Sequence, residues 1–169
     1  MERSPVMFRS QTYGKLNMDQ IAEKILEFHD RTKTFDGELQ VTVGTDSQNF
    51  DKTKVVSVIA AYKEGHGGIF FYEVTMIPRI SDVARKLNEE TSRSLSVIMD
   101  LAEKLEGEKY QGLRENTVLS VHIDAGWSEK GKTKELIPSL VGWIRACGYD
   151  CRVKPDSYAA SSIADRISK

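Results

Sequence analysis

The sequence predicts an α/β fold built on a mixed sheet, in which three antiparallel strands precede alternating helices and parallel strands, with helices on both faces of the sheet. Two observations lead to this prediction. Three runs rich in β-branched and aromatic residues begin near Gln40, Val55 and Ile69, with short, turn-rich connectors between them. A long amphipathic segment, 81–105, then precedes the apolar run 118–124, which is typical of a strand buried on both faces of a sheet.

We expect one domain over residues 38–169, preceded by an N-terminal extension, residues 1–37, that consists of a leader and a helix packed on the domain. Residues 1–16 mix Pro, Arg, Ser and Gln without a period, which predicts a loosely held leader. Asn17 is placed to cap a helix that ends near Arg31, because apolar residues recur there at helical spacing. We expect the apolar side of this amphipathic helix to pack on the domain.

The last third of the chain continues the alternation of helix and strand. Apolar residues over 136–144 predict a helix with Pro138 in or near its first turn, where a missing N–H costs least. A short strand is expected over 151–153, and Asp156 or Ser157 is expected to cap a final helix. The expected order of elements in the domain is therefore β-β-β-α-β-α-β-α.

Composition limits the classes of protein to which the chain can belong. The formal net charge is −1, so no strongly basic field indicates nucleic acid, although an acidic balance does not exclude it. The two cysteines, Cys147 and Cys151, are too few for a structural zinc site or a disulfide scaffold. The start of the chain lacks an apolar signal-peptide core, and no stretch has the apolar length of a membrane helix. We therefore expect a cytoplasmic protein with no membrane partner.

Acidic residues fall at the ends of two expected core strands. Asp46 ends the first strand and Asp124 ends the fourth. Neighbouring strands lie about 4.8 Å apart, so these two carboxylates can share an ion if the strands are adjacent.

The long helix offers a third carboxylate, from either Glu89 or Glu90. Glu90 borders the apolar stripe, whereas Glu89 falls among basic residues nearly opposite it. An inward carboxylate costs free energy unless it is paired or bound to a metal, which favours Glu90 as the site residue. In the final helix, Asp165 lies near the edge of the packed side, while Asp156 is explained as an N-cap; both stay open as a fourth carboxylate.

Four stretches together resemble the YkuK-type bacterial proteins of the ribonuclease H-like superfamily. They are VTVGTDSQ, the glutamate-bearing helix, VHIDAGW and KPDSYAASSIADR, and the resemblance extends from Leu39 to the C-terminus. It implies a ribonuclease H-like fold in which Asp46, Glu90, Asp124 and Asp165 are catalytic residues that bind two divalent cations, Mg²⁺ or Mn²⁺. The implied reaction is hydrolysis of phosphodiester bonds in DNA or RNA, which hard oxygen ligands and two ions about 3.5–4 Å apart can support.

Basic and aromatic residues after the fourth strand are candidates for substrate binding. Lys130, Lys132 and Lys134 can contact a nucleic-acid backbone, and Trp127 can stack on a base. His122 precedes Asp124 by two residues and thus shares its face of the strand; we expect it to be a hydrogen-bonded histidine of the sheet.

Two other functions compete with the nuclease interpretation. The string from Gly126 to Thr133 satisfies the P-loop pattern G-x-x-x-x-G-K-[ST] and would place Lys132 on a nucleotide phosphate. The chain after Thr133 is too short for the downstream strands of a P-loop domain, and Pro138 would interrupt the following helix. The other alternative is a noncatalytic nucleic-acid or protein-binding module on the same fold.

Overall fold

The computed structural model describes residues 6–127, 129–157, 159 and 164–169, without the side chains of residues 165 and 166. The strands are β1 (Phe8–Ser10), β2 (Gly14–Leu16), β3 (Leu39–Asn49), β4 (Thr53–Tyr62), β5 (Gly68–Ile77), β6 (Thr117–Gly126) and β7 (Asp150–Lys154). The helices are α1 (Met18–Thr32), α2 (Val83–Lys104), α3 (Gln111–Glu115), α4 (Lys132–Ala146) and α5 (Asp165–Ser168), with a 3-10 turn at Glu108–Tyr110.

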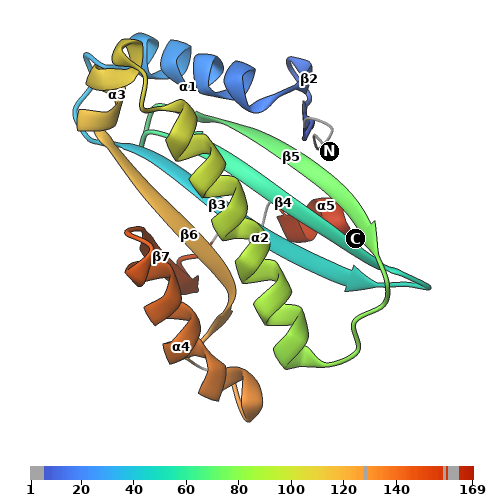
Figure 1. Cartoon of the computed structure of the whole chain (residues 1–169). Coiled ribbons are helices and arrows are strands. Elements are labelled where there is room, and N and C mark those ends of the chain that lie inside the picture. The colour runs from blue at the N-terminus through green and yellow to red at the C-terminus, as the bar shows by residue number, and fades with distance from the viewer. Residues whose placement is uncertain (1–5, 128, 158, 160–163) are drawn as a thin grey trace.

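The strands form one mixed sheet in the order β2-β1-β5-β4-β3-β6-β7. β3, β4 and β5 pair antiparallel in chain order, whereas β6 lies parallel to β3 and β7 lies parallel to β6. Hairpin turns join the three antiparallel strands, and α2 and α4 make the crossovers that parallel pairing requires (Figure 1). The predicted fold class and the predicted order of the core strands are confirmed.

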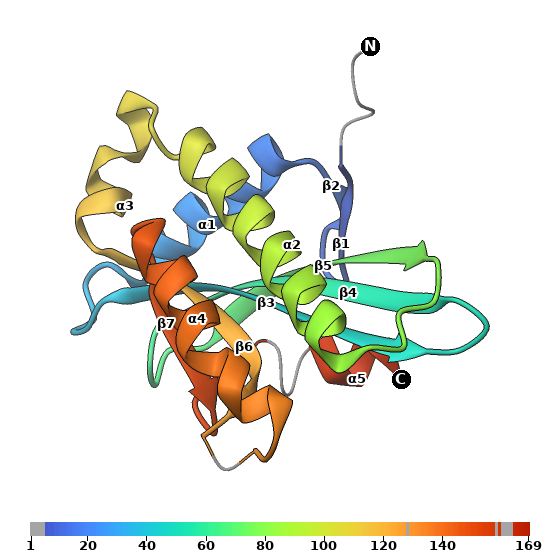
Figure 2. The same ribbon diagram turned by 60° about the horizontal axis from the view of Figure 1, so that its bottom comes forward.

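Helices cover the two faces of the sheet unequally. α1, α2 and α4 lie on one face, and α5 lies on the other (Figure 2). The main hydrophobic core fills the first of these layers, with Ile25 of α1, Ile98 of α2 and Ile144 of α4 all fully buried. α1 begins as expected, since Asn17 and Gln20 form a reciprocal capping box.

The N-terminal segment is held more firmly than the sequence indicates. β1 pairs antiparallel with β2 and extends the sheet through the pair Arg9↔Tyr72 with β5, while Phe8 is fully buried. The prediction of a loosely held leader is therefore wrong for residues 8–16. Each strand of this hairpin has three residues, which is too few for strand periodicity to be recognised. The boundary between residues 37 and 38 stays a prediction.

α4 begins earlier than its apolar pattern indicates. Its first turn, from Lys132, is polar, and the buried residues start only at Ile137. Pro138 consequently lies inside the helix, so the predictions that it lies in or near the first turn and that it would interrupt the helix after the P-loop-like string are both wrong. The expected final helix falls largely on residues outside the described part of the chain. Its C-terminal end lies within the described part and is α5.

Candidate functional site

Asp46 and Asp124 lie on neighbouring parallel strands at the same end of the sheet. The register of β3 and β6 runs from Leu39↔Thr117 to Gly44↔His122. Asp46 and Asp124 each follow the last of these pairs by two residues, so strand alternation places both side chains on one face. β3 continues to Asn49 and β6 to Gly126; hence both aspartates lie inside their strands rather than at their ends. The two strands separate beyond the last pair (Figure 1).

The residues that flank Asp46 face α2. The Thr45 hydroxyl lies 2.7 Å from the hydroxyl of Ser94 in α2. The Ser47 hydroxyl donates a 2.7 Å hydrogen bond to Oε1 of Glu90, also in α2. Asp46 therefore points to the opposite face, as alternation along the strand requires.

Asp46 is buried against α5. Its side chain is 3% exposed, and the Ser168 hydroxyl of α5 donates a 2.8 Å hydrogen bond to its Oδ2. This contact joins the C-terminal helix to the acidic site. Asp165 begins α5, three residues before Ser168, but its side chain lies outside the described part of the structure. Asp156 is exposed in the turn after β7.

Glu90 is turned inward and Glu89 outward. Glu90 is 6% exposed, whereas Glu89 forms a 2.7 Å ion pair with Arg93 near the surface of the same helix. Burial raises the pKa of Glu90 to about 8; the Ser47 hydrogen bond opposes this rise, while the charges of Asp46 and Asp124 add to it. The three carboxylates thus interact electrostatically, and Glu90 carries a proton at neutral pH when no cation is near.

Lys154 at the end of β7 faces the same acidic residues. Its Nζ lies 3.2 Å from Oδ1 of Asp124 and 4.0 Å from Oε1 of Glu129. Partial burial lowers the pKa of Lys154. The charge and hydrogen bond of Asp124, and then the charges of Glu129 and Asp46, raise it by more, so the net pKa lies above the usual value of a lysine. The lysine is thus an ammonium held among carboxylates.

Gly126 allows this close approach of β7. A Cβ at residue 126 would lie 2.9 Å from the backbone oxygen of Lys154, inside contact distance. The register between β6 and β7 shifts between His122 and Gly126, where Gly126 pairs with Lys154. Sequence reasoning missed Lys154 because this shifted register, rather than any motif, brings it to Asp124.

The chemistry of these donors fits a divalent cation, although their arrangement is not that of a formed metal centre. Carboxylate oxygens are the ligands that Mg²⁺ and Mn²⁺ prefer, and a cation would offset the burial and the repulsion from Asp46 and Asp124 that raise the pKa of Glu90. Within the described residues, no group of three acidic, histidine or cysteine side chains is gathered closely enough to hold a metal ion. A cation at Asp124 would have to displace Lys154.

The expected substrate-binding residues lie at this end of the molecule. Trp127 directly follows β6 and is 53% exposed. Lys130, Lys132 and Lys134 are exposed in the following loop and the first turn of α4. All four side chains are accessible to a ligand, and their contact with a substrate stays a prediction.

His122 is a hydrogen-bonded histidine of the sheet, as expected. It is 2% exposed, and its Nδ1 accepts a 3.2 Å hydrogen bond from the backbone N–H of Ala159. Burial and then the charge of Arg152 lower the pKa of His122 to about 4. The ring is neutral at physiological pH and connects β6 with the C-terminal segment.

Comparisons with known proteins identify the family. The family described as Ribonuclease H-like matches residues 20–169. The chain belongs to the ribonuclease H-like family. It is also 31% identical over 139 residues to the "Uncharacterized protein YkuK" of Bacillus subtilis (strain 168), over 76% of this chain and 78% of that protein. The predicted resemblance to YkuK-type proteins is confirmed.

A solved structure resembles this ribonuclease H-like protein in part. A solved structure of the Mos1 transposase catalytic domain with Raltegravir and Mn is 14% identical, with a TM-score of 0.28, and the similarity covers 79% of this chain but only 57% of that one.

Among the described residues, none of the helices has the length and apolar character needed to cross a membrane. The string that resembles a P-loop, Gly126–Thr133, connects β6 to α4 in a ribonuclease H-like sheet, so the fold expected of a P-loop domain is not the one found.

Proposed function

We propose that this ribonuclease H-like protein is a divalent-metal-dependent nuclease that hydrolyses phosphodiester bonds of DNA or RNA with two bound Mg²⁺ or Mn²⁺ ions. One observation carries the proposal. Asp46 of β3, Glu90 of α2 and Asp124 of β6 interact electrostatically at one end of the sheet, and two of them are buried. Concentrated negative charge of this kind costs free energy that a divalent cation would offset.

In this proposal, three sets of residues bind the metal ions, orient the carboxylates and bind the substrate. Asp46, Glu90, Asp124 and Asp165 hold the metal ions, which supply electrophilic activation of the phosphate and of water. Hydroxyl groups orient two of these carboxylates, since Ser47 donates to Glu90 and Ser168 donates to Asp46. The phosphates are bound by the exposed side chains of Lys130, Lys132 and Lys134. A base stacks on the exposed ring of Trp127.

The test combines metal binding with cleavage. Calorimetric titration with Mn²⁺ should show saturable binding to the wild type and a loss of affinity of about tenfold or more in Asp46→Asn, because a ligand charge is removed. A panel of single- and double-stranded DNA and RNA should be cut by the wild type, and activity should fall at least ~100-fold in Asp46→Asn. Glu89→Gln is the matched control, since it removes a carboxylate from the outer side of the same helix and should change neither result. Absence of both metal binding and cleavage in the wild type would refute the proposal.

A noncatalytic nucleic-acid or protein-binding module is the second candidate function. The ion pair between Lys154 and Asp124 favours it, because a resident ammonium can neutralise part of the acidic cluster without a metal. This candidate requires that binding persists in Asp124→Asn and in the absence of divalent ions. Loss of all binding in that variant would argue against it.

A further inference from the structure

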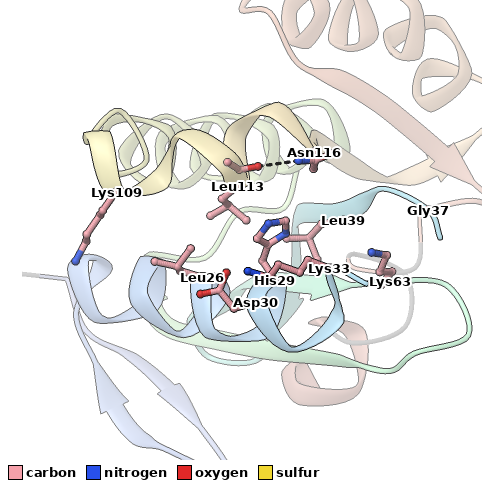
Figure 3. Close-up of a pocket in the computed structure, with 11 residues that line it drawn as sticks. Leu26, His29, Asp30, Lys33, Gly37, Leu39, Lys63, Lys109, Leu113 and Asn116 are labelled. Atoms are coloured by element: carbon pink, nitrogen blue, oxygen red, sulfur yellow. Dashed lines mark hydrogen bonds between the residues drawn. The ribbon is translucent and has the colours of Figure 1, made fainter. Parts of the chain in front are cut away.

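A second site lies at the other end of β3. A cavity of about 410 Å³ that opens to solvent is lined by residues of α1 and α3 and by Leu39, the first residue of β3. Leu39 precedes Asp46 by seven residues, or about 23 Å along an extended strand. The cavity is therefore separate from the acidic site, and Figure 3 shows the side chains that surround it.

Lys63 places a buried positive charge at this cavity. The residue is 5% exposed, and its Nζ donates a 2.8 Å hydrogen bond to the backbone oxygen of Thr32 at the end of α1. An ammonium has three N–H donors, of which this contact uses one. Lys63 has no ion pair with any described carboxylate. The Thr32 oxygen at the negative end of α1 compensates this charge only in part, because it is a dipole and not an ion, so an anion in the cavity would stabilise the ammonium further.

Lys33 and His29 add further donors around the same space. Lys33 follows α1 and has no carboxylate partner among the described residues. The His29 ring makes no hydrogen bond to any of them, and it extends from α1 towards Leu113 of α3 (Figure 3). Burial lowers the pKa of His29, and the charges of Lys63 and Lys33 lower it further, against the opposing charge of Asp30. The charges of Lys63 and Lys33 therefore both reach the part of the cavity that the His29 ring lines.

The remaining charges leave the cavity positive. Asp30 is the one carboxylate among the lining residues, and it is outnumbered by Lys33 and Lys63. Lys109 lies at the opposite end of the cavity from Lys63 (Figure 3), where it pairs with Glu23 at 3.3 Å.

The end of α1 opposes an anion only in part. The last backbone oxygens of a helix carry partial negative charge, and in α1 two of them, those of His29 and Thr32, lie near a side-chain donor. The Thr32 hydroxyl lies 2.8 Å from the oxygen of Phe28 and 3.4 Å from that of His29, and Lys63 bonds the oxygen of Thr32 itself. Lys63 and the Thr32 hydroxyl thus offset part of the negative end of the helix.

The cavity also has an apolar wall. Leu26 of α1, Leu39 of β3 and Leu113 of α3 line it together with the charged groups. Its volume falls within the range of about 300–1,000 Å³ that is usual for sites of small organic ligands, which combine apolar walls with a few polar groups. The space exceeds what a lone oxyanion would fill.

We propose that this cavity binds a phosphate monoester of a small organic molecule of about the size of a nucleoside monophosphate. Lys33 and Lys63 hold the phosphate dianion with His29 beside them, and the organic part packs against Leu26, the lining leucine whose side chain is partly exposed. Ammonium groups bind a phosphate as point charges that its several acceptor oxygens can share. The inference does not depend on the proposed nuclease activity, because none of its residues belongs to the acidic site.

The test is a calorimetric titration of the full chain without divalent ions. The ligands are AMP, GMP, CMP, UMP, the four nucleosides and inorganic phosphate. At least one monophosphate should bind saturably and more tightly than its nucleoside and inorganic phosphate. Lys33→Glu should weaken it by about tenfold or more, because a charge reversal within a few ångströms of the phosphate changes the binding free energy by over 1 kcal/mol. Lys15→Glu, which reverses an exposed lysine on β2 outside the cavity, should bind as the wild type does.

Three outcomes would overturn the proposal. They are no saturable binding of any monophosphate at millimolar concentration, equal affinity in Lys33→Glu and Lys15→Glu, and a nucleoside or inorganic phosphate that binds as tightly as every monoester. Nuclear magnetic resonance provides a second measurement that does not rely on a variant. The bound monophosphate should raise the pKa of His29 and leave the buried ring of His122 unchanged, and a His29 resonance that never responds would also contradict the site.

Discussion

At the scale of single residues, Glu90 gives the sharpest expectation. Its pKa is raised to about 8 by burial and by Asp46 and Asp124, so the folded state holds a proton that the unfolded chain releases near pH 4.5. Between these two pH values the native state binds more protons, and stability falls as the pH rises. The contribution is present in full below about pH 4.5 and is lost as the pH passes 8, with an upper limit on the order of 5 kcal/mol.

Glu90→Gln should remove this decrease of stability with rising pH. Urea unfolding in a chelator at pH 5 and pH 8 should show that the wild type loses more stability than the variant between the two values, because glutamine stays neutral at both. Glu89→Gln serves as the control, since Glu89 is paired with Arg93 near the surface and should keep the wild-type slope. An unchanged slope in Glu90→Gln would show that the carboxylate is not held neutral by its surroundings.

At the scale of elements, the hairpin of β1 and β2 extends the sheet and contributes to the main core. Phe8 is fully buried beside Leu16 in the main core. Phe8→Ala should therefore lower the free energy of unfolding by about 3 kcal/mol, the usual cost of removing a buried aromatic ring. Val6→Ala, at a residue that is 48% exposed, should change it by no more than about 0.5 kcal/mol. Urea unfolding measures both, and equal stability of the two variants would mean that the hairpin detaches at little cost.

The elements also show how far the sequence predicts the structure. β3, β4, β5 and β6 could be predicted because each is long enough to show strand periodicity, and turn residues separate the first three. The same reasoning predicted that Asp46 and Asp124 lie on adjacent parallel strands and that Glu90 faces inward, as the structure shows. It missed the β1–β2 hairpin, whose strands are short, and the start of α4, whose first turn has no apolar residue. It also missed Lys154 and Ser168, because their contacts with the aspartates depend on tertiary packing and a shifted register.

At the scale of the whole molecule, the acidic site draws on elements from across the chain. β3 and β6 supply aspartates, α2 supplies Glu90, β7 supplies Lys154, and α5 contributes Ser168. The packing of the sheet on both of its faces therefore determines the geometry of the site. A ligand that binds only this folded arrangement should stabilise the entire domain, by about 2.7 kcal/mol at a concentration one hundred times its dissociation constant.

Lys154 should then limit the affinity for divalent ions, because its ammonium lies 3.2 Å from Oδ1 of Asp124 and competes with a cation for that oxygen. Lys154→Met should bind Mn²⁺ more tightly than the wild type, by about tenfold, and should show a larger rise in melting temperature when Mn²⁺ is added. Lys130→Met removes one charge from the neighbouring exposed loop and should leave the Mn²⁺ affinity close to that of the wild type. Calorimetry and thermal unfolding with and without Mn²⁺ measure the two effects separately. Equal Mn²⁺ affinity in the two variants would mean that Lys154 does not compete for Asp124, and its ion pair would then serve only to hold β7 against β6.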